Sequence, residues 1–165
     1  MAVLVAYGSK RGGTEGLAQM LADGLRSEAL KVDLAPARQV RDLSGYDAVL
    51  VGGALYVGRW YSDARRFVRR NAGALCQRPT WFFSSGPLDS SAAEGDIPPV
   101  KGVRALMGRV GARGHATFGG RLAPDAKGYP ASAMAKKSSG DWRDQDQVNT
   151  WARAVASELR SAFEA

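Results

Sequence analysis

The strongest indication of the fold is the stretch AVLVAYGSKRGGT, which covers residues 2–14. Its first half is an unbroken apolar run, which is typical of a parallel strand covered on both faces. Its second half is a glycine-rich turn. After this turn, leucine or alanine stands at positions 17, 18, 21, 22 and 25, which is the spacing of an amphipathic helix. A strand, a glycine-rich turn and a helix in this order predict one unit of an α/β fold.

Four further apolar segments outside this unit read as strands. They cover residues 31–34, 48–53, 80–84 and 115–118. The third strand of the chain, at 48–53, is expected to end at its two glycines, Gly52 and Gly53. Strands that alternate with helices predict an open parallel sheet, and the common five-stranded order is 2-1-3-4-5. We therefore expect a flavodoxin-like α/β three-layer sandwich, with helices on both faces of a five-stranded sheet.

Helical patterns fill most of the remaining chain. Helices are expected at residues 62–71 and 100–110, and a final helix carries the stripe Val148, Trp151, Ala152, Val155, Leu159 and Phe163. Asp144 and Gln147 resemble a capping box at the start of that helix. Residues 86–99 are rich in Gly, Pro and Ser and predict a loop. Residues 119–140 are expected to be irregular, with one helical turn near 132–137.

The composition limits the class of protein. The chain has 165 residues, 45% of them hydrophobic, and we expect one domain over residues 1–165. The N-terminus lacks the features of a signal peptide, and no segment approaches the ~20 apolar residues that span a bilayer. A soluble, cytoplasmic protein is therefore expected. The net charge of +7 favours anionic partners: nucleic acid, acidic proteins, phosphorylated ligands or an anionic membrane surface.

In sheets of this order, ligands bind beyond the carboxyl ends of the strands, at the topological switch point between the first and third strands. The loops to consider therefore follow Tyr7, Gly53 and Ser84. The first of these loops consists of Ser9, Lys10, Arg11, Gly12, Gly13 and Thr14. Its glycines allow backbone N–H groups to turn inward, its end hydroxyls can donate to phosphate oxygens, and a helix N-terminus follows.

Two well-known nucleotide loops do not fit this stretch. No Gly-Lys-Ser/Thr closes it as in a Walker A loop, and it lacks the dinucleotide pattern G-x-G-x-x-G, so ATP and NAD are both disfavoured. The structural alternative is a plain glycine-rich turn in which Thr14 caps the helix. Ser9, Gly12 and Thr14 match the T-x-T-G-x-T phosphate loop of the flavodoxins, which this segment resembles. The resemblance implies FMN, with Arg11 in the place of a third hydroxyl.

The same resemblance assigns the other two loops to the flavin ring. Ring contacts are expected from Ala54, Leu55, Tyr56, Val57 and Gly58, and from Ser84, Ser85, Gly86 and Pro87. Leu55, Tyr56 and Trp60 can supply a flat apolar contact, although Trp60 is equally compatible with ordinary packing. No catalytic side chain and no metal ligand are expected, because the flavin carries the chemistry.

Several segments resemble one branch of these proteins, the quinone-dependent protoporphyrinogen oxidases. They are GGALYVGRW at residues 52–60, FFS at 82–84 and GDWRD at 140–144, and the resemblance runs from about Val3 to Leu159. It implies an FMN oxidoreductase that passes electrons from an organic substrate or reductant to a quinone or another acceptor. That branch carries a longer and more apolar insertion before the last helix, whereas residues 119–140 are short and polar here.

Two other functions are compatible with parts of the sequence. The first is an electron-transfer shuttle without substrate chemistry, but typical shuttle flavodoxins are acidic. The second is a nucleic-acid module, but no known nucleic-acid motif appears, so we expect no nucleic-acid partner. The arginines at positions 65, 66, 69 and 70 share one helix face. This face is either solvated or a docking surface for an acidic redox partner or a membrane, which Arg59 would extend. The single histidine, His115, has no second member for a metal site or triad.

Overall fold

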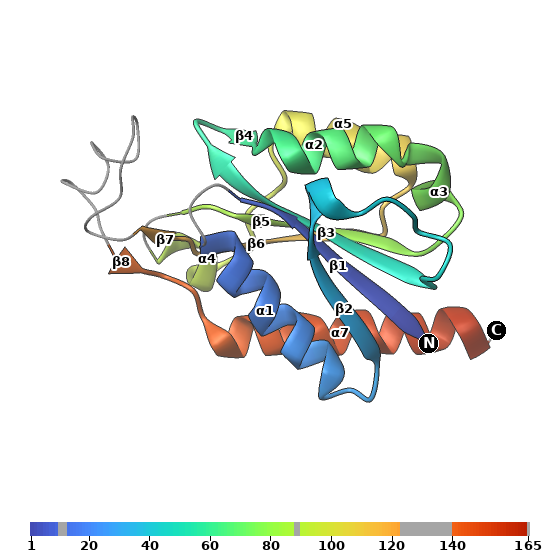
Figure 1. Cartoon of the computed structure of the whole chain (residues 1–165). Helices are drawn as coiled ribbons and strands as arrows, with labels where there is room; N and C mark the ends of the chain where they lie inside the picture. Colours follow the sequence, from blue (N-terminus) through green and yellow to red (C-terminus); the bar gives the residue numbers. More distant parts are fainter. Residues whose placement is uncertain (10–12, 88–89, 123–139, 165) are drawn as a thin grey trace.

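The computed structural model describes residues 1–9, 13–87, 90–122 and 140–164. Five parallel strands form its central sheet, in the order β2-β1-β3-β5-β6 (Figure 1). They are β1 (Ala2–Gly8), β2 (Lys31–Pro36), β3 (Ala48–Tyr56), β5 (Thr80–Ser85) and β6 (Gly114–Phe118). In chain order this arrangement is the predicted 2-1-3-4-5, and the predicted flavodoxin-like topology is therefore confirmed.

Helices cover both faces of the sheet (Figure 1). One face is covered by α1 (Gly13–Arg26) and α7 (Gln145–Glu164). The other is covered by α2 (Ser62–Arg70), α3 (Ala72–Cys76) and α5 (Lys101–Val110), with a short 3-10 turn, η1 (Ala37–Gln39), beside them. The result is the three-layer sandwich that the alternation of strands and helices predicts.

Strand β1 shows why the apolar runs are unbroken. Val3 and Val5 contact the core beneath α1 and α7, whereas Leu4 and Ala6 contact the core beneath α2 and α5. All four side chains are at most 1% exposed. Successive side chains of a strand point to opposite faces, so a strand covered on both faces needs apolar residues at every position.

Strand β3 is longer than expected. Gly52 and Gly53 do not end it; the strand continues to Tyr56 and returns as the short antiparallel strand β4 (Arg59–Trp60). The glycines instead make room for aromatic rings, because a Cβ on Gly52 would collide with the Phe83 ring and one on Gly53 would lie 2.9 Å from Trp60 Cγ. Glycine here provides a close approach of side chains, and not a turn.

The β3–β4 hairpin turns through Val57 and Gly58, with φ angles of 52° and 72°. Two positive φ angles in a two-residue loop are typical of a type I′ turn, which prefers Asn-Gly. A β-branched residue at the first position is strained. Val57 is also 87% exposed, so packing does not compensate for that strain.

The C-terminal third differs from the prediction in detail. Residues 86–99 contain a short helix, α4 (Ser91–Glu94). Asp144 Oδ1 accepts the backbone N–H of Gln147 at 3.2 Å, but the Gln147 amide donates to the Ala92 carbonyl at 2.7 Å, so only half of the capping box forms. Phe163 is 49% exposed and leaves the predicted apolar stripe.

A two-stranded antiparallel ribbon precedes the last helix, formed by β7 (Arg121–Leu122) and β8 (Gly140–Asp141). The helical turn expected near 132–137 lies outside the described residues.

Candidate functional site

The three predicted ligand loops begin at one edge of the sheet. Gly8 of β1 pairs with Gly53 of β3, and Gly53 pairs with Ser84 of β5. The three strands therefore reach the same edge of the sheet: β1 ends at Gly8 and β5 at Ser85, while β3 continues past this level to Tyr56. This is the carboxyl edge where ligands bind in doubly wound sheets.

Two hydroxyl groups at the first loop are buried without a partner. Ser9 Oγ and Thr14 Oγ1 form no hydrogen bond with any part of the chain that the structure describes. Thr14 is 1% exposed and is the second residue of α1, so it does not act as the N-cap of that helix. Lys10, Arg11 and Gly12 of the predicted loop lie outside the described residues.

The surroundings of these hydroxyls fit a phosphate. The N-terminus of the 14-residue helix α1 begins at Gly13 and presents backbone N–H groups and the positive end of its dipole. Strand β1 and helix α2 also lie close together at this edge, because a Cβ on Gly8 would lie 2.7 Å from the backbone nitrogen of Ala64. The acid of the first turn, Glu15, accepts a hydrogen bond from the Tyr7 hydroxyl; burial, together with this carboxylate, raises the pKa of Tyr7.

The other two loops touch each other. A Cβ on Gly86 would lie 2.8 Å from Leu55 Cδ1, and the Gly86 N–H donates to the Phe118 carbonyl at 3.0 Å. Tyr56 packs edge-on against Tyr61, with ring centroids 5.8 Å apart. Half-buried apolar and aromatic side chains thus stand at the sheet edge, beside the first loop.

The remaining predicted ring-contact positions differ in accessibility. Ala54 and Ser85 are nearly covered, at 6% and 5% exposure, while Val57 projects into solvent. The Pro87 carbonyl accepts the N–H of Gly120 at 2.9 Å, which anchors the third loop to the segment after β6.

Trp60 and Ser84 belong to the core. The Trp60 indole is 2% exposed, and its Nε1–H donates to Ser84 Oγ at 2.9 Å. Ser84 Oγ also lies 2.9 Å from His115 Nε2. Because indole only donates, the Ser84 hydroxyl accepts from Trp60, and its bond to His115 Nε2 can run in either direction according to the imidazole tautomer. Trp60 is therefore a packing residue, and the Ser84 hydroxyl is already engaged within the protein.

This Trp60–Ser84–His115 line was not foreseen from the sequence, which marked His115 only as a lone histidine. Burial lowers the pKa of His115 to about 4, so the imidazole is neutral at pH 7. Its Nδ1 is buried and has no partner in the described part of the chain. The line joins β4, the second strand of the hairpin, to β5 and β6.

The segment GDWRD at residues 140–144 packs beside α1 and the end of β6. The Trp142 N–H donates to the Gly120 carbonyl at 2.9 Å. Arg143 forms an ion pair with Asp141 at 2.7 Å, and its guanidinium lies against Gly16, where a Cβ would collide with it. These contacts connect the segment before α7 to the first turns of α1. The sequence indicated only the family resemblance of this segment and the capping role of Asp144, and not these contacts.

The four arginines of α2 do not form one uniform surface. Arg65 donates from Nε to the Trp60 carbonyl at 3.0 Å, and Arg70 donates to the Val40 carbonyl at 3.4 Å on the other flank of the helix. Arg66 is exposed. Arg65 and Arg69 line a hollow beside the hairpin. A docking role for all four together stays a prediction.

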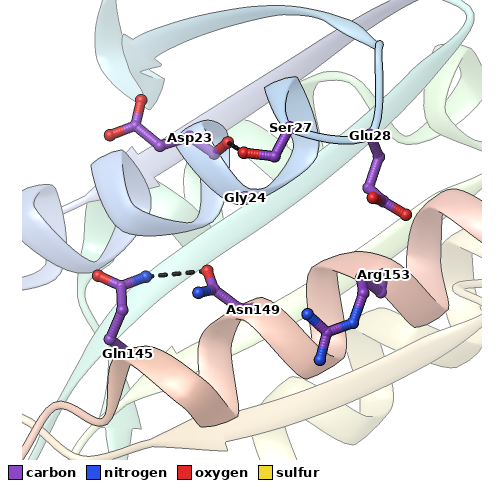
Figure 2. A pocket seen from close by; sticks show the side chains of 7 residues that line it. All are labelled: Asp23, Gly24, Ser27, Glu28, Gln145, Asn149 and Arg153. Atoms are coloured by element: carbon purple, nitrogen blue, oxygen red, sulfur yellow. Dashed lines mark hydrogen bonds between the residues drawn. The ribbon is translucent and has the colours of Figure 1, made fainter.

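A separate surface hollow lies between α1 and α7 (Figure 2). Its polar groups are largely paired with each other: Gln145 donates to Asn149 at 2.9 Å, and the Ser27 hydroxyl donates to the Asp23 carbonyl at 3.0 Å. The hollow forms where Gly24 lets the two helices approach, since a Cβ there would lie 3.0 Å from the Ala152 methyl group. This hollow results from the packing of α1 against α7, and it lies on the opposite face of the sheet from the hollow beside the β3–β4 hairpin.

Two features are absent from the described residues. No helix in the described ranges is long and apolar enough to cross a membrane. No group of three or more His, Cys, Asp or Glu side chains in those ranges could hold a metal ion.

Comparisons with known proteins agree with the geometry. Two curated relatives are 27% identical: the protoporphyrinogen IX dehydrogenase [quinone] of Escherichia coli K12 over 86 residues, and the NAD(P)H dehydrogenase (quinone) of Bradyrhizobium diazoefficiens over 114. The alignments cover 51% and 56% of this chain and 48% and 57% of the relatives. The chain thus spans about half the length of the curated relatives it matches.

Solved structures support the fold. A flavodoxin from the domain Archaea matches with a TM-score of 0.66 at 15% identity, covering 97% of this chain and 99% of its own. The rubredoxin oxygen:oxidoreductase of Desulfovibrio gigas matches with a TM-score of 0.68 at 20% identity, covering 99% of this chain but 37% of its own.

Finally, residues 4–130, well over half of the chain, match the flavodoxin domain family. The protein therefore belongs to the flavodoxin domain family, whose members carry out redox reactions with a bound flavin.

Proposed function

We propose that this protein binds FMN at the carboxyl edge of its sheet and uses it as an oxidoreductase. The observation that carries the proposal is the pair of buried hydroxyls at the N-terminus of α1, Ser9 Oγ and Thr14 Oγ1, which have no hydrogen-bond partner among the residues that the structure describes. Buried polar groups are normally hydrogen-bonded, so an unpaired pair calls for a ligand that accepts from both. A phosphate is such an acceptor, and a helix N-terminus favours it electrostatically.

The other two loops would hold the flavin ring. Leu55 and Tyr56 supply apolar surface next to the phosphate end, and the third loop, from Ser85 to Pro87, lies beside them. The contact between Gly86 and Leu55 fixes the spacing of the two loops. When bound, FMN would supply the electron transfer, and the side chains would position it and exclude water from one face.

We further propose that electrons pass between an organic substrate or reductant and a quinone or another acceptor. The names of both curated relatives include a quinone, which supports this choice of acceptor. The net charge of +7 suits an anionic substrate or partner. Because both core clusters pack on one sheet, we take residues 1–165 to act as a single domain.

The test begins with the absorbance spectrum of the purified full chain and the mass of any flavin released from it. FMN is expected, because the site has one phosphate loop. Titration of the flavin-free protein should then give tighter binding for FMN than for riboflavin, which lacks the phosphate. Release of FAD, or equal affinities for FMN and riboflavin, would refute the proposed phosphate site.

A redox titration of the flavin-bound protein distinguishes two roles. A single two-electron step supports the oxidoreductase that exchanges electron pairs with a quinone. Two well-separated one-electron steps would indicate the electron-transfer shuttle, the other role open to this fold.

A further inference from the structure

A hollow of about 430 Å³ lies beside the β3–β4 hairpin, on the face covered by α2 and α5. Figure 1 shows these two helices side by side, with β4 near them. The hollow is lined by Arg59, Trp60, Arg65, Arg69, Lys101 and Val103, among others. It is distinct from the first loop, because that loop leads into α1 on the opposite face of the sheet. Its volume is within the range of small-molecule sites.

The charges around this hollow all have one sign. Four cationic side chains line it, and no lining residue is acidic. Arg65 is held in place by its hydrogen bond to the Trp60 carbonyl. Within the described ranges, Arg59, Arg69 and Lys101 form no ion pair. Like charges gathered around one space repel each other unless an anion neutralises them.

The first turn of α5 adds to this field. Lys101, Gly102 and Val103 of that turn line the hollow. The preceding residue, Val100, gives no side-chain cap, and the turn holds no acid. A lysine at a helix N-terminus opposes the helix dipole, and no side-chain cap occupies the N–H groups of this turn. Departures from such local rules concentrate at functional sites.

We propose that this hollow binds the oxyanion group of a small organic molecule, a phosphate or a carboxylate. The oxyanion lies between Arg69, Lys101 and the first turn of α5, all of which line the hollow. The rest of the molecule lies against apolar lining residues such as Val100 and Val103. Two or more cations and a helix N-terminus together make a strong oxyanion site.

Two probes test the proposal on the full-length protein: phenyl phosphate and benzoate, which share an aromatic ring and differ in the oxyanion. Backbone amide shifts are followed by NMR during titration. Saturable shifts are expected at Gly102, Val103 and Gly58, and added NaCl should weaken them because charge dominates. Saturation with phenyl phosphate alone identifies a phosphate site; saturation with both identifies a general oxyanion site.

Three variants separate the site from general charge. Arg69→Gln and Lys101→Gln should each weaken probe binding about tenfold. Arg66→Gln is the matched control, since Arg66 lies on the same helix, is exposed, and does not line the hollow. The three positions are exposed, so all variants are expected to fold, which thermal unfolding checks.

Two results would overturn the proposal. One is a titration in which neither probe shifts the amides of Gly102 and Val103. The other is an equal loss of affinity in Arg66→Gln and Arg69→Gln, which would mean that only net charge attracts the probes. The amide shifts of Gly102 and Val103 report on the hollow whether or not flavin is bound, so a failure of this proposal and a failure of the proposed FMN site give different results.

Discussion

Removing the Thr14 hydroxyl should weaken FMN binding without lowering the stability of the flavin-free protein. Thr14→Val keeps the shape of the side chain and removes the hydroxyl. Since Thr14 is 1% exposed and its Oγ1 is unpartnered among the described residues, the flavin-free protein loses no hydrogen bond. Its stability should stay the same or rise by about 1 kcal/mol. FMN binding should lose one charge-assisted hydrogen bond of about 1.5–3 kcal/mol, or roughly 10- to 150-fold in affinity.

The assay is a fluorescence titration of the flavin-free protein with FMN and, in parallel, with riboflavin. Only the FMN affinity should fall in the variant. Thr80→Val is the matched control, because Thr80 is fully buried but its hydroxyl donates to the Leu75 or Arg78 carbonyl. That variant should lose about 1 kcal/mol of stability in urea unfolding and keep its FMN affinity.

The reasoning fails if Thr14→Val destabilises the flavin-free protein as much as Thr80→Val does. In that case the Thr14 hydroxyl is structural. An unchanged FMN affinity would place the phosphate elsewhere. Ser9→Ala should behave like Thr14→Val, since Ser9 Oγ is buried without a partner in the same part of the described chain.

Three further predictions concern the hairpin and the side chains behind it. Val57→Asn should raise the free energy of unfolding by about 0.5–1 kcal/mol, because Asn tolerates the φ of 52° better than a β-branched residue. Urea unfolding measures this change, and a lower midpoint than in the parent would contradict it. Ser84→Ala should lose about 1–3 kcal/mol by leaving the Trp60 indole N–H unpaired, while Ser85→Ala, as the control in the same unfolding experiment, should lose less. The pKa of His115 is about 4 in the folded protein and 6.5 in the unfolded chain, so the unfolded state binds more protons at low pH. The free energy of unfolding should therefore fall as the pH drops from 6.5 through 4. Urea unfolding at several pH values in that range should show a weaker dependence of this free energy on pH in His115→Gln than in the parent.

The parts of the fold that depend on local pattern could be predicted from sequence. Each parallel strand is an apolar run because both of its faces are covered, and the first helix shows its stripe at regular spacing. The strand order followed from general rules on crossovers. The positions of Ser9 and Thr14 at the sheet edge followed from the same order, because it fixes which strand ends lie together.

The errors arose where a residue's role depends on a distant partner. Gly52 and Gly53 looked like the end of a strand, but they accommodate the rings of Phe83 and Trp60, which belong to other elements. The β3–β4 hairpin was therefore missed. Gln147 had the spacing of a capping residue, yet the Ala92 carbonyl, 55 positions away, takes its amide.

The Trp60–Ser84–His115 line could not be read from sequence either. It requires the register between β5 and β6, which pairs Phe82 with His115 and brings the histidine ring to the serine hydroxyl. No spacing of residue types in the chain encodes that register.

The short hairpin between β3 and β4 has a consequence for regulation. It contributes Leu55 and Tyr56 to the proposed flavin site and Gly58 and Arg59 to the cationic hollow, so ligands at the two places would contact neighbouring residues of one hairpin. Coupling between two binding sites is reciprocal: the factor by which one ligand changes the affinity for the other applies equally in both directions. An organic anion would then set how fully the protein is loaded with its cofactor, and cofactor loading would in turn set how tightly that anion is retained.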